Sequence, residues 1–443
     1  MLSPLFVAFL LISSIAAIIL LSARFKFNTF FVLLIIAAVV GFAAGFDGEK
    51  VIVMLKTGFG STLEKIGLLI ICGTTLGILL EKSNATLSLA QFILSKTGDS
   101  KAALALTLIG FMVGLPIFCD SGFVVLIGLG MSIVSRLPKW HVALVVCLAS
   151  ALYSVHCLVP PHPGITAAAG IMKVDVGRAM FLGTLVAVPP TVVAYFWAKY
   201  INQKLGLTFS ESIDSQLLSV QKLPHPLTSV LPIFVPILLI ALKSLVMLNP
   251  SFLPPSVLYT LKILGEPLVA LFVGILFALP LYKNADRAHI NSLFDTALDK
   301  SGGILAITAA GGAFGEVIKA LELGKVFGDS LAASGLGLVI PFALAAIFKT
   351  AQGSSTVAII STAGIIAPLL PSLGFDTEGG HLFALLAAGA GSMLVSHTND
   401  SYFWVIAKFS SLDTVTTLRS HSVASVLMAV AAFVSIWVAS LFV

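Results

Sequence analysis

Residues 116–124 read PIFCDSGFV and place one aspartate, Asp120, inside a long apolar stretch. No Lys, Arg, Asp or Glu lies between Lys101 and Asp120, and the next charged residue after Asp120 is Arg136. A helix that spans the hydrocarbon of a bilayer needs about 20 mostly apolar residues. The stretch therefore predicts a membrane segment that is interrupted by a small polar cluster.

The composition of the whole chain is that of a membrane protein. Of its 443 residues, 58% are hydrophobic and 10% are charged, with a mean hydropathy of +1.08, whereas soluble chains carry about 25% charged residues. Charge-free runs long enough to cross a bilayer occur at 1–23, 27–46, 102–119, 179–198, 331–348, 350–375 and 422–443. With the shorter apolar runs, they predict an all-α, polytopic membrane protein of about ten to fourteen membrane segments.

Charge distribution and missing motifs exclude several functions. The net charge is +5, but the Lys and Arg residues are scattered over short loops, which is typical of membrane-protein orientation and not of a nucleic-acid patch. The sequence has no GxxxxGK[ST] phosphate loop, no HExxH and no GxSxG. We therefore expect no enzyme activity, no cofactor and no bound metal. Four cysteines lie in apolar segments and are interpreted as buried free thiols: Cys72, Cys119, Cys147 and Cys157.

Three landmarks recur in the same order in the two halves of the chain. They are a GxxxG followed by a charged pair, an apolar run broken by small polar residues, and a histidine at a second break. They begin at Gly73, Phe118 and Ser154 in the first half and at Gly311, Phe348 and Val395 in the second. Their spacings are unequal, so coincidence stays an alternative, but transporters are commonly built from such repeats.

The repeat suggests a division of the chain. We expect N-terminal transmembrane helices in 1–65, a first repeat in 66–198 and a hydrophilic central linker in 199–227. Connecting or scaffold helices would occupy 228–300, a second repeat 301–410 and a C-terminal transmembrane helix 411–443.

The polar breaks predict a binding site. VPPHPG (159–164), AQGSST (351–356) and HTNDS (397–401) interrupt apolar runs, and non-helical backbone is tolerated in a membrane where it lines a protected cavity. Helix N-termini exposed there attract anions. The expected substrate-binding residues are Asp120, Ser121, Gly122, His156, His162, Gln352, Gly353, Ser354, Ser355, Thr356, His397, Thr398, Asn399 and Asp400.

Two carboxyl groups are candidates for proton coupling. Ionisable residues inside the membrane are costly and usually functional, which favours this role for Asp120 and Asp400. The alternative for Asp120 is a helix end outside the hydrocarbon. The histidines at the breaks are equally compatible with structural hydrogen bonding and with proton transfer.

Lysine and glutamate residues near the second-half breaks also have competing interpretations. Lys349 is either a snorkelling lysine at an interface or a partner for a substrate carboxylate. Glu316 and Lys319 have a helical spacing that predicts a structural ion pair. The GxxxG motifs most simply permit close helix packing.

A secondary transporter explains these features better than a membrane-embedded enzyme or a channel. An enzyme would concentrate its acid, base and nucleophile in one constellation, and a channel would repeat pore-loop chemistry in an oligomer. The duplicated breaks favour the transporter.

The chain resembles the gluconate permease family, the GntP-type transporters of the ion transporter superfamily, in four motifs: PIFCDSGFVVL, SVHCLVPPHPG, GSSTVAIISTAGIIAP and SHTNDSYFWV. The resemblance runs from about Gly67 to Phe409. It implies inverted repeats, re-entrant hairpins and a mobile transport domain held by a scaffold, usually in a homodimer. It also implies a multi-pass symporter of the bacterial inner membrane that imports a small hydroxylated carboxylate with a proton.

The identity of the carboxylate stays open on this resemblance. Gluconate, related sugar acids, short hydroxy acids and D-serine are carried by similar transporters, and sodium coupling is an alternative to proton coupling. Gluconate-type members tend to have a glutamate with hydrophobic neighbours where this chain has Cys119, Asp120 and Ser121. The acidic group is kept here but is one methylene shorter.

Overall fold

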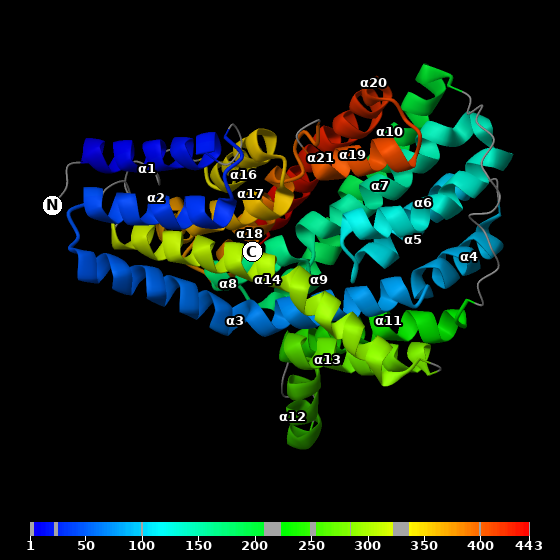
Figure 1. Ribbon diagram of the computed structural model, residues 1–443, viewed down its shortest axis with the longest axis horizontal. Coiled ribbons are helices and arrows are strands. Elements are labelled where there is room, and N and C mark those ends of the chain that lie inside the picture. Colours follow the sequence, from blue (N-terminus) through cyan, green and yellow to red (C-terminus); the bar gives the residue numbers. More distant parts are fainter. Residues whose placement is uncertain are drawn as a thin grey trace.

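The computed structural model describes residues 4–21, 25–98, 101–207, 223–248, 254–283, 285–321, 336–397 and 400–442 (Figure 1). Within these ranges the secondary structure is helical and no strand occurs. The expected all-α class is therefore confirmed.

Most of the helices are short, and α3 (Gly48–Lys82) and α14 (Arg287–Ala320) are the long ones. The first half has α1 (Pro4–Ile19), α2 (Thr29–Ala43), α3 (Gly48–Lys82), α4 (Ala85–Thr97), α5 (Ala102–Gly114), α6 (Cys119–Arg136), α7 (His141–Leu158), α8 (Pro163–Ile171), α9 (Val176–Val186) and α10 (Val188–Leu205). The second half has α11 (Pro226–Leu248), α12 (Pro255–Leu264), α13 (Pro267–Ala278), α14 (Arg287–Ala320), α16 (Val339–Gln352), α17 (Ser355–Ile366), α18 (Glu378–Gly391), α19 (Ser401–Phe409), α20 (Thr414–Thr417) and α21 (Val423–Ser440). Single 3₁₀ or π turns connect some of them, at Pro138–Trp140, Leu279–Tyr282, Ala367–Leu369, Pro371–Leu373 and Leu418–Ser422.

Apolar helices long enough to cross a bilayer are present. Among the described residues these are Pro138–Ile171, Val176–Leu205, Arg287–Ala320 and Thr414–Ser440. Two bent pairs raise the number of such spans from four to as many as six, with bends of 45° within α3 and 71° between α12 and α13. Shorter apolar helices of 10–17 residues accompany them. The chain is thus a multi-pass membrane protein with broken helices, and the number of crossings stays a prediction.

Two long helices, α3 and α14, run antiparallel against each other and cross the centre of Figure 1. Glycines allow the close approach: a Cβ added at Gly58 would lie 2.5 Å from the carbonyl oxygen of Gly312. The far end of the pair is marked by Lys300 and Glu81, whose charged atoms are 3.9 Å apart. This pair is the support against which the broken helices lie.

Each half contains two broken helix pairs in the same order. In the first half α5 and α6 are separated at 115–118, and α7 and α8 at 159–162. In the second half the breaks are 353–354 between α16 and α17 and 392–400 between α18 and α19. The pairs interlock across the halves, because α6 packs on α19 and α17 packs on α8. All four breaks are thereby gathered in the middle of the molecule.

The GxxxG motifs of both halves do permit close packing, as predicted. A Cβ at Gly73 would lie 2.9 Å from the side chain of Pro161, and one at Gly77 would lie 2.8 Å from the carbonyl oxygen of Pro116. The motif of α3 thus packs directly against two of the breaks. In α14, Gly315 lies against the backbone of Gly364 in α17.

Several expected boundaries differ from the helices. The boundary at 65/66 falls inside α3 and the one at 300/301 falls inside α14. The expected linker 199–227 includes the end of α10 and the first residues of α11, and 208–222 lie outside the described residues. The 65/66 boundary coincides with the 45° bend of α3, between Glu64 and Gly67.

Candidate functional site

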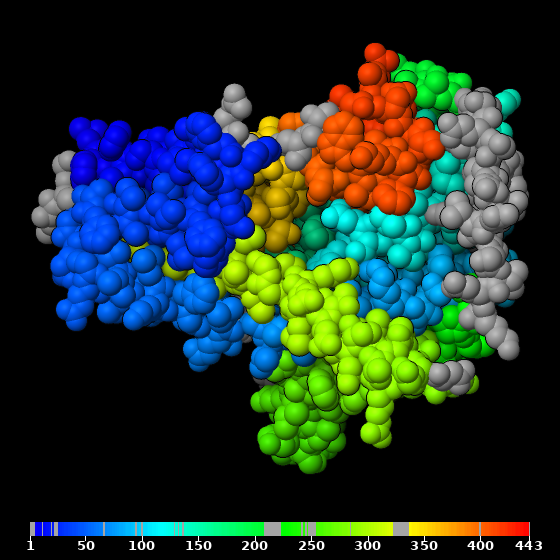
Figure 2. All heavy atoms as spheres, in the orientation of Figure 1, coloured from blue at the N-terminus to red at the C-terminus, as the bar shows by residue number. Residues whose placement is uncertain are grey.

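A cavity of about 370 Å³ lies where the four breaks meet. All four broken pairs contribute to its wall, and α14 closes one side. It is lined by Phe118, Cys119, Asp120, Ser121, Tyr153, His156, Pro163, Lys300, Ile304, Ile307, Ser354, Ser355, Thr356, Val357, Ile360, Ser401 and Tyr402. Figure 2 shows a hollow between the yellow-green α14, the gold α17, the orange α19 and the cyan α6. We call this space the first cavity.

Four helices begin at the wall of the first cavity. The first residues of α6, α8, α17 and α19 are Cys119, Pro163, Ser355 and Ser401, and each of them lines the cavity. A helix N-terminus carries a partial positive charge and presents amide hydrogens that lack partners within the helix. Four such ends directed at one space favour a negatively charged ligand.

Two of these helix ends are capped and two are open. The Ser354 hydroxyl accepts from the Val357 amide at 3.3 Å, and the Asp400 carboxylate accepts from the Tyr402 amide at 3.0 Å. No side chain caps the first turn of α6 or of α8 within the described residues. In α6 the amides of Cys119, Asp120 and Ser121 are therefore the available donors for an anion at the cavity wall. Pro163, the first residue of α8, has no amide hydrogen, so the donors of that turn are the amides of Gly164 and Ile165 behind it.

Asp120 lies in the first turn of α6, half-buried at the cavity wall. The Cys119 thiol donates to its Oδ1 at 3.6 Å, and no ion pair with Asp120 occurs within the described residues. Asp120 is therefore a carboxyl group at the cavity wall that has no ionic partner among the described residues.

Asp400 has the opposite environment, although it is also at a helix N-terminus. Lys349 Nζ donates to its Oδ2 at 2.6 Å and to the carbonyl oxygen of Gly353 at 2.8 Å. The Ser396 hydroxyl donates to the same carboxylate oxygen at 2.5 Å. Both charged side chains are almost completely buried, so Lys349 is not a snorkelling lysine. The pair ties the end of α16 to the start of α19 and does not line the first cavity.

Two tyrosines that were not expected from the sequence form part of the wall. The rings of Tyr153 and Tyr402 stack with centroids 5.5 Å apart. The Tyr153 hydroxyl shares a hydrogen bond of 2.8 Å with the Ser355 hydroxyl, and Tyr402 donates to the carbonyl of Ala149 at 2.9 Å. A phenol in an apolar membrane segment must find such partners, which is the signal that would have revealed them.

The predicted histidines separate into two groups. His156 lines the first cavity, and its ring lies 4.8 Å from the ring of His162, centroid to centroid. His162 is buried behind it, with Nε2 2.7 Å from the carbonyl of Gly114. His397 lies elsewhere, with Nε2 3.1 Å from the carbonyl of Thr350.

Of the other predicted residues, some line the cavity and others do not. Ser121, Ser354, Ser355 and Thr356 line it, whereas Gly122, Gln352 and Gly353 do not. Gly122 packs against Leu152, and Gly353 ends α16 at a φ of 82°, which a glycine adopts without strain. Thr398 and Asn399 lie outside the described residues. The ion pair expected between Glu316 and Lys319 is present at 2.9 Å.

Comparison with known proteins identifies the family. The model of the GntP family permease matches residues 5–442. The chain belongs to the GntP permease family. It is therefore a membrane transport protein and not an enzyme, as the duplicated breaks indicated.

Curated relatives of this permease cover nearly all of it. An L-idonate transporter of the Gnt-II system from Escherichia coli K12 is 31% identical over 94% of this chain and 95% of its own. A high-affinity gluconate transporter from the same organism is 30% identical, with the same coverage. The inner membrane permease YgbN, also from Escherichia coli K12, is 29% identical over 96% of both chains.

A solved structure supports the fold of the permease. The Alcanivorax borkumensis YdaH transporter matches with a TM-score of 0.64 and 15% identity, over 89% of this chain and 90% of its own. The crystal structure of that transporter has an unusual topology. At this identity the likeness concerns the fold alone.

Proposed function

We propose that this permease imports a small hydroxylated carboxylate, gluconate or a related sugar acid, together with a proton. The observation that carries the proposal is the convergence of four helix N-termini on the first cavity. Such a site accommodates an anionic group of a ligand. The names of the gluconate and L-idonate transporters among the relatives agree with this substrate class.

The substrate would lie with its two ends in different surroundings. Its carboxylate would accept from the open amides at the first turns of α6 and α8. Its hydroxyl groups would bond to Ser121, Thr356 and the hydroxyl pair of Tyr153 and Ser355. A volume of about 370 Å³ is in the range of small-molecule sites, which is about 300–1,000 Å³.

The position of Asp120 at the wall of the first cavity supports proton coupling. An ionised Asp120 would occupy the same positive field as the substrate carboxylate and repel it, because like charges at close range disfavour each other strongly in a low dielectric. Protonation of Asp120 removes this repulsion, so substrate and proton would bind together. The charge of Asp400 is compensated by the ion pair with Lys349. We propose that this pair holds α19 in place.

The membrane arrangement completes the proposal. The interlocking of α6 with α19 and of α17 with α8 supports two inverted repeats that share one site, and we propose a homodimer in the bacterial inner membrane. The relative YgbN is an inner membrane permease, which supports that membrane.

Uptake by purified permease in proteoliposomes tests the proposal. Labelled gluconate, other sugar acids, short hydroxy acids and D-serine should be compared under an imposed proton gradient, with and without a protonophore and with and without sodium. We expect a sugar acid to accumulate, the protonophore to abolish accumulation, and sodium to be dispensable. Accumulation that follows a sodium gradient in the presence of the protonophore would refute proton coupling. Preference for D-serine, or for no acid at all, would refute the substrate class.

A further inference from the structure

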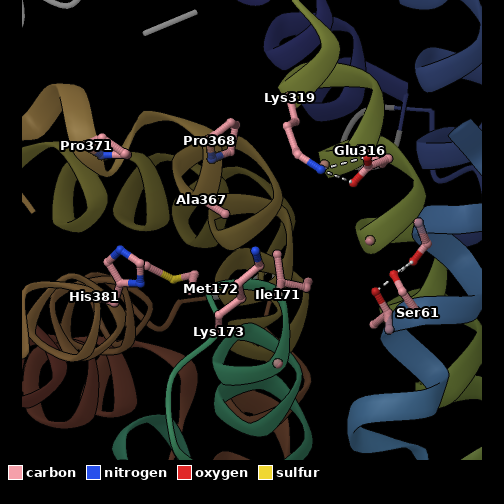
Figure 3. A pocket seen from close by; sticks show the side chains of 15 residues that line it. Ser61, Ile171, Met172, Lys173, Glu316, Lys319, Ala367, Pro368, Pro371 and His381 are labelled. Atoms are coloured by element: carbon pink, nitrogen blue, oxygen red, sulfur yellow. Dashed lines mark hydrogen bonds and ion pairs between the residues drawn. The ribbon is translucent and has the colours of Figure 1, made fainter. Parts of the chain in front are cut away.

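A second cavity, of about 380 Å³, lies farther along the same helices (Figure 3). Its wall combines glycine backbone, hydroxyl groups and cationic side chains. It is lined by Gly58, Ser61, Thr62, Gly170, Ile171, Met172, Lys173, Gly312, Gly315, Glu316, Lys319, Ala367, Pro368, Pro371 and His381. It shares no residue with the first cavity.

Three helices lead from the first cavity to the second. In α8 the first cavity is lined at Pro163 and the second at 170–173, and in α14 the first is lined at 300–307 and the second at 312–319. In α17 the first is lined at its N-terminal end, and the second begins at Ala367, directly after the helix. At about 1.5 Å per helical residue, the two cavities are stacked along one direction.

An apolar cluster separates them. Ile70, Ala167 and Ile360 are buried in contact, and Ile171, Ile304, Leu305 and Ile307 pack against them. We call these seven residues the apolar plug. The plug is formed by residues of α3, α8, α14 and α17. Ile304, Ile307 and Ile360 also line the first cavity and Ile171 also lines the second, so the plug borders both cavities.

The second cavity has an excess of positive charge. Lys319 donates to both carboxylate oxygens of Glu316, at 2.9 and 3.2 Å, and this pair is neutral. Lys173 follows α8 and points into the cavity in Figure 3, and no ion pair with it occurs within the described residues. Counted over Lys173, Lys319 and Glu316, the lining carries one uncompensated positive charge.

Hydroxyl groups on the opposite wall of this cavity from Lys173 are oriented to accept hydrogen bonds (Figure 3). The Ser61 and Thr62 hydroxyls donate to the carbonyl of Gly58, at 3.4 and 2.8 Å. Their oxygen lone pairs are therefore left for a polyhydroxylated ligand. Lys173 would meet the carboxylate of a hydroxylated monocarboxylate, and the Ser61 and Thr62 oxygens would accept from its hydroxyl groups.

We propose that the second cavity is a carboxylate-binding vestibule, in which Lys173 pairs with the anion on the far side of the apolar plug from the first cavity. The substrate class rests on the proposed function. The vestibule lowers the cost of moving a carboxylate away from the four helix N-termini, because the anion meets a compensating charge after passing the plug.

A labelling experiment tests the vestibule. Ser61→Cys, in a full-length background without the four native cysteines, should react with a small uncharged thiol reagent. Gluconate should slow this reaction several-fold, and sorbitol, the corresponding uncharged polyol, should not. Lys173→Gln should abolish the protection, whereas the matched change Lys262→Gln, at an exposed lysine of α12, should preserve it. Equal protection by sorbitol, or protection that survives Lys173→Gln, would overturn the proposal.

A reporter in the first cavity distinguishes this failure from failure of the proposed function. Ser121→Cys lines the first cavity and should be measured in parallel. Protection at position 121 without protection at position 61 overturns the vestibule and leaves the proposed function intact. Protection at neither position overturns the substrate class for both cavities. Protection at position 61 alone supports the vestibule and refutes the first cavity as the gluconate site.

Discussion

At the scale of single residues, the contrast between two carboxyl groups organises the site. Asp120 and Asp400 both lie at helix N-termini in the same region. Asp400 is buried with a charged partner and two further hydrogen-bond donors, whereas Asp120 borders the first cavity and has a thiol as its neighbour. The charge of Asp400 is therefore compensated within the fold, whereas the carboxyl group of Asp120 faces the cavity without an ionic partner among the described residues. We propose different roles for the two aspartates on this ground.

Replacing Asp120 with Asn separates coupling from binding. Asn has nearly the same shape but releases no proton, so uphill accumulation driven by a proton gradient should be lost. Counterflow of labelled against unlabelled substrate should survive, because the neutral side chain resembles protonated Asp120. Asp413→Asn, at the exposed N-cap of α20, is the control and should accumulate normally. Full accumulation by Asp120→Asn would remove Asp120 from the coupling role.

Replacing Lys349 with Met tests the structural role of the buried ion pair. Removing one partner leaves Asp400 buried and uncompensated, which costs about 3–5 kcal/mol. We expect a large fall in the melting temperature of the purified protein in detergent. The double variant Lys349→Met/Asp400→Asn should recover most of the loss, because no charge is then stranded. Equal stability of the single and double variants would show that the pair is not coupled.

At the scale of helices, the cavity exists because helices begin at it. Prolines, glycines and hydroxyl residues in the breaks stop one helix and start the next, and this could be read from the sequence. The α3 GxxxG motif then brings that helix against two breaks, at Pro161 and Pro116. Because Gly73 and Gly77 have no side chain, α3 contacts these breaks closely, and we expect this contact to hold the open turns of α6 and α8 in place.

Gly77→Ala tests this contact. The added Cβ would lie 2.8 Å from the carbonyl oxygen of Pro116, so the break between α5 and α6 must shift. We expect a fall in transport rate and in melting temperature. Gly60→Ala is the matched control in the same helix, where a Cβ meets nothing within 4 Å. There the alanine should be neutral or slightly stabilising, by up to about 1 kcal/mol. A normal transport rate for Gly77→Ala would disprove the packing role.

At the scale of the whole molecule, both halves contribute to one cavity, and one long helix, α14, lines two cavities. Ser121 and Ser355 are far apart in the sequence but line the same space. The first and second cavities are both bounded by α14. We expect that a relative movement of α8 and α17 along this helix would change which of the two cavities the substrate can reach.

Cysteines placed in the two halves test the shared site. Ser121→Cys and Ser355→Cys should both react more slowly with a membrane-permeant thiol reagent when the transported acid is present, because a pocket commonly buries over about 70% of its ligand's surface. Ser256→Cys, at an exposed position of α12, should be unaffected. Protection at Ser121 without protection at Ser355 would mean that the second half does not contribute to binding.

Much of the site was predictable, since polar residues inside apolar runs are rare and costly. Asp120, Ser121, His156 and the Ser354–Thr356 segment were selected on this ground, and they do line one cavity. Tyr153, Tyr402 and Lys300 were missed because each lies within an ordinary helical pattern. Their contribution depends on which face of the helix meets a neighbour.

The sequence by itself determined the membrane class, the helical fold, the positions of the breaks and the family, because these follow from hydropathy, turn chemistry and motifs that are local in the chain. Tertiary structure alone decided which polar groups meet. It paired Lys349 with Asp400, 51 residues apart, placed His397 outside the lining of the first cavity, and brought Lys173 and Lys319 to the wall of a second one. The physical reason is that charges and hydrogen bonds act over a few ångströms. Their partners are therefore chosen by the packing of helices that are distant in sequence.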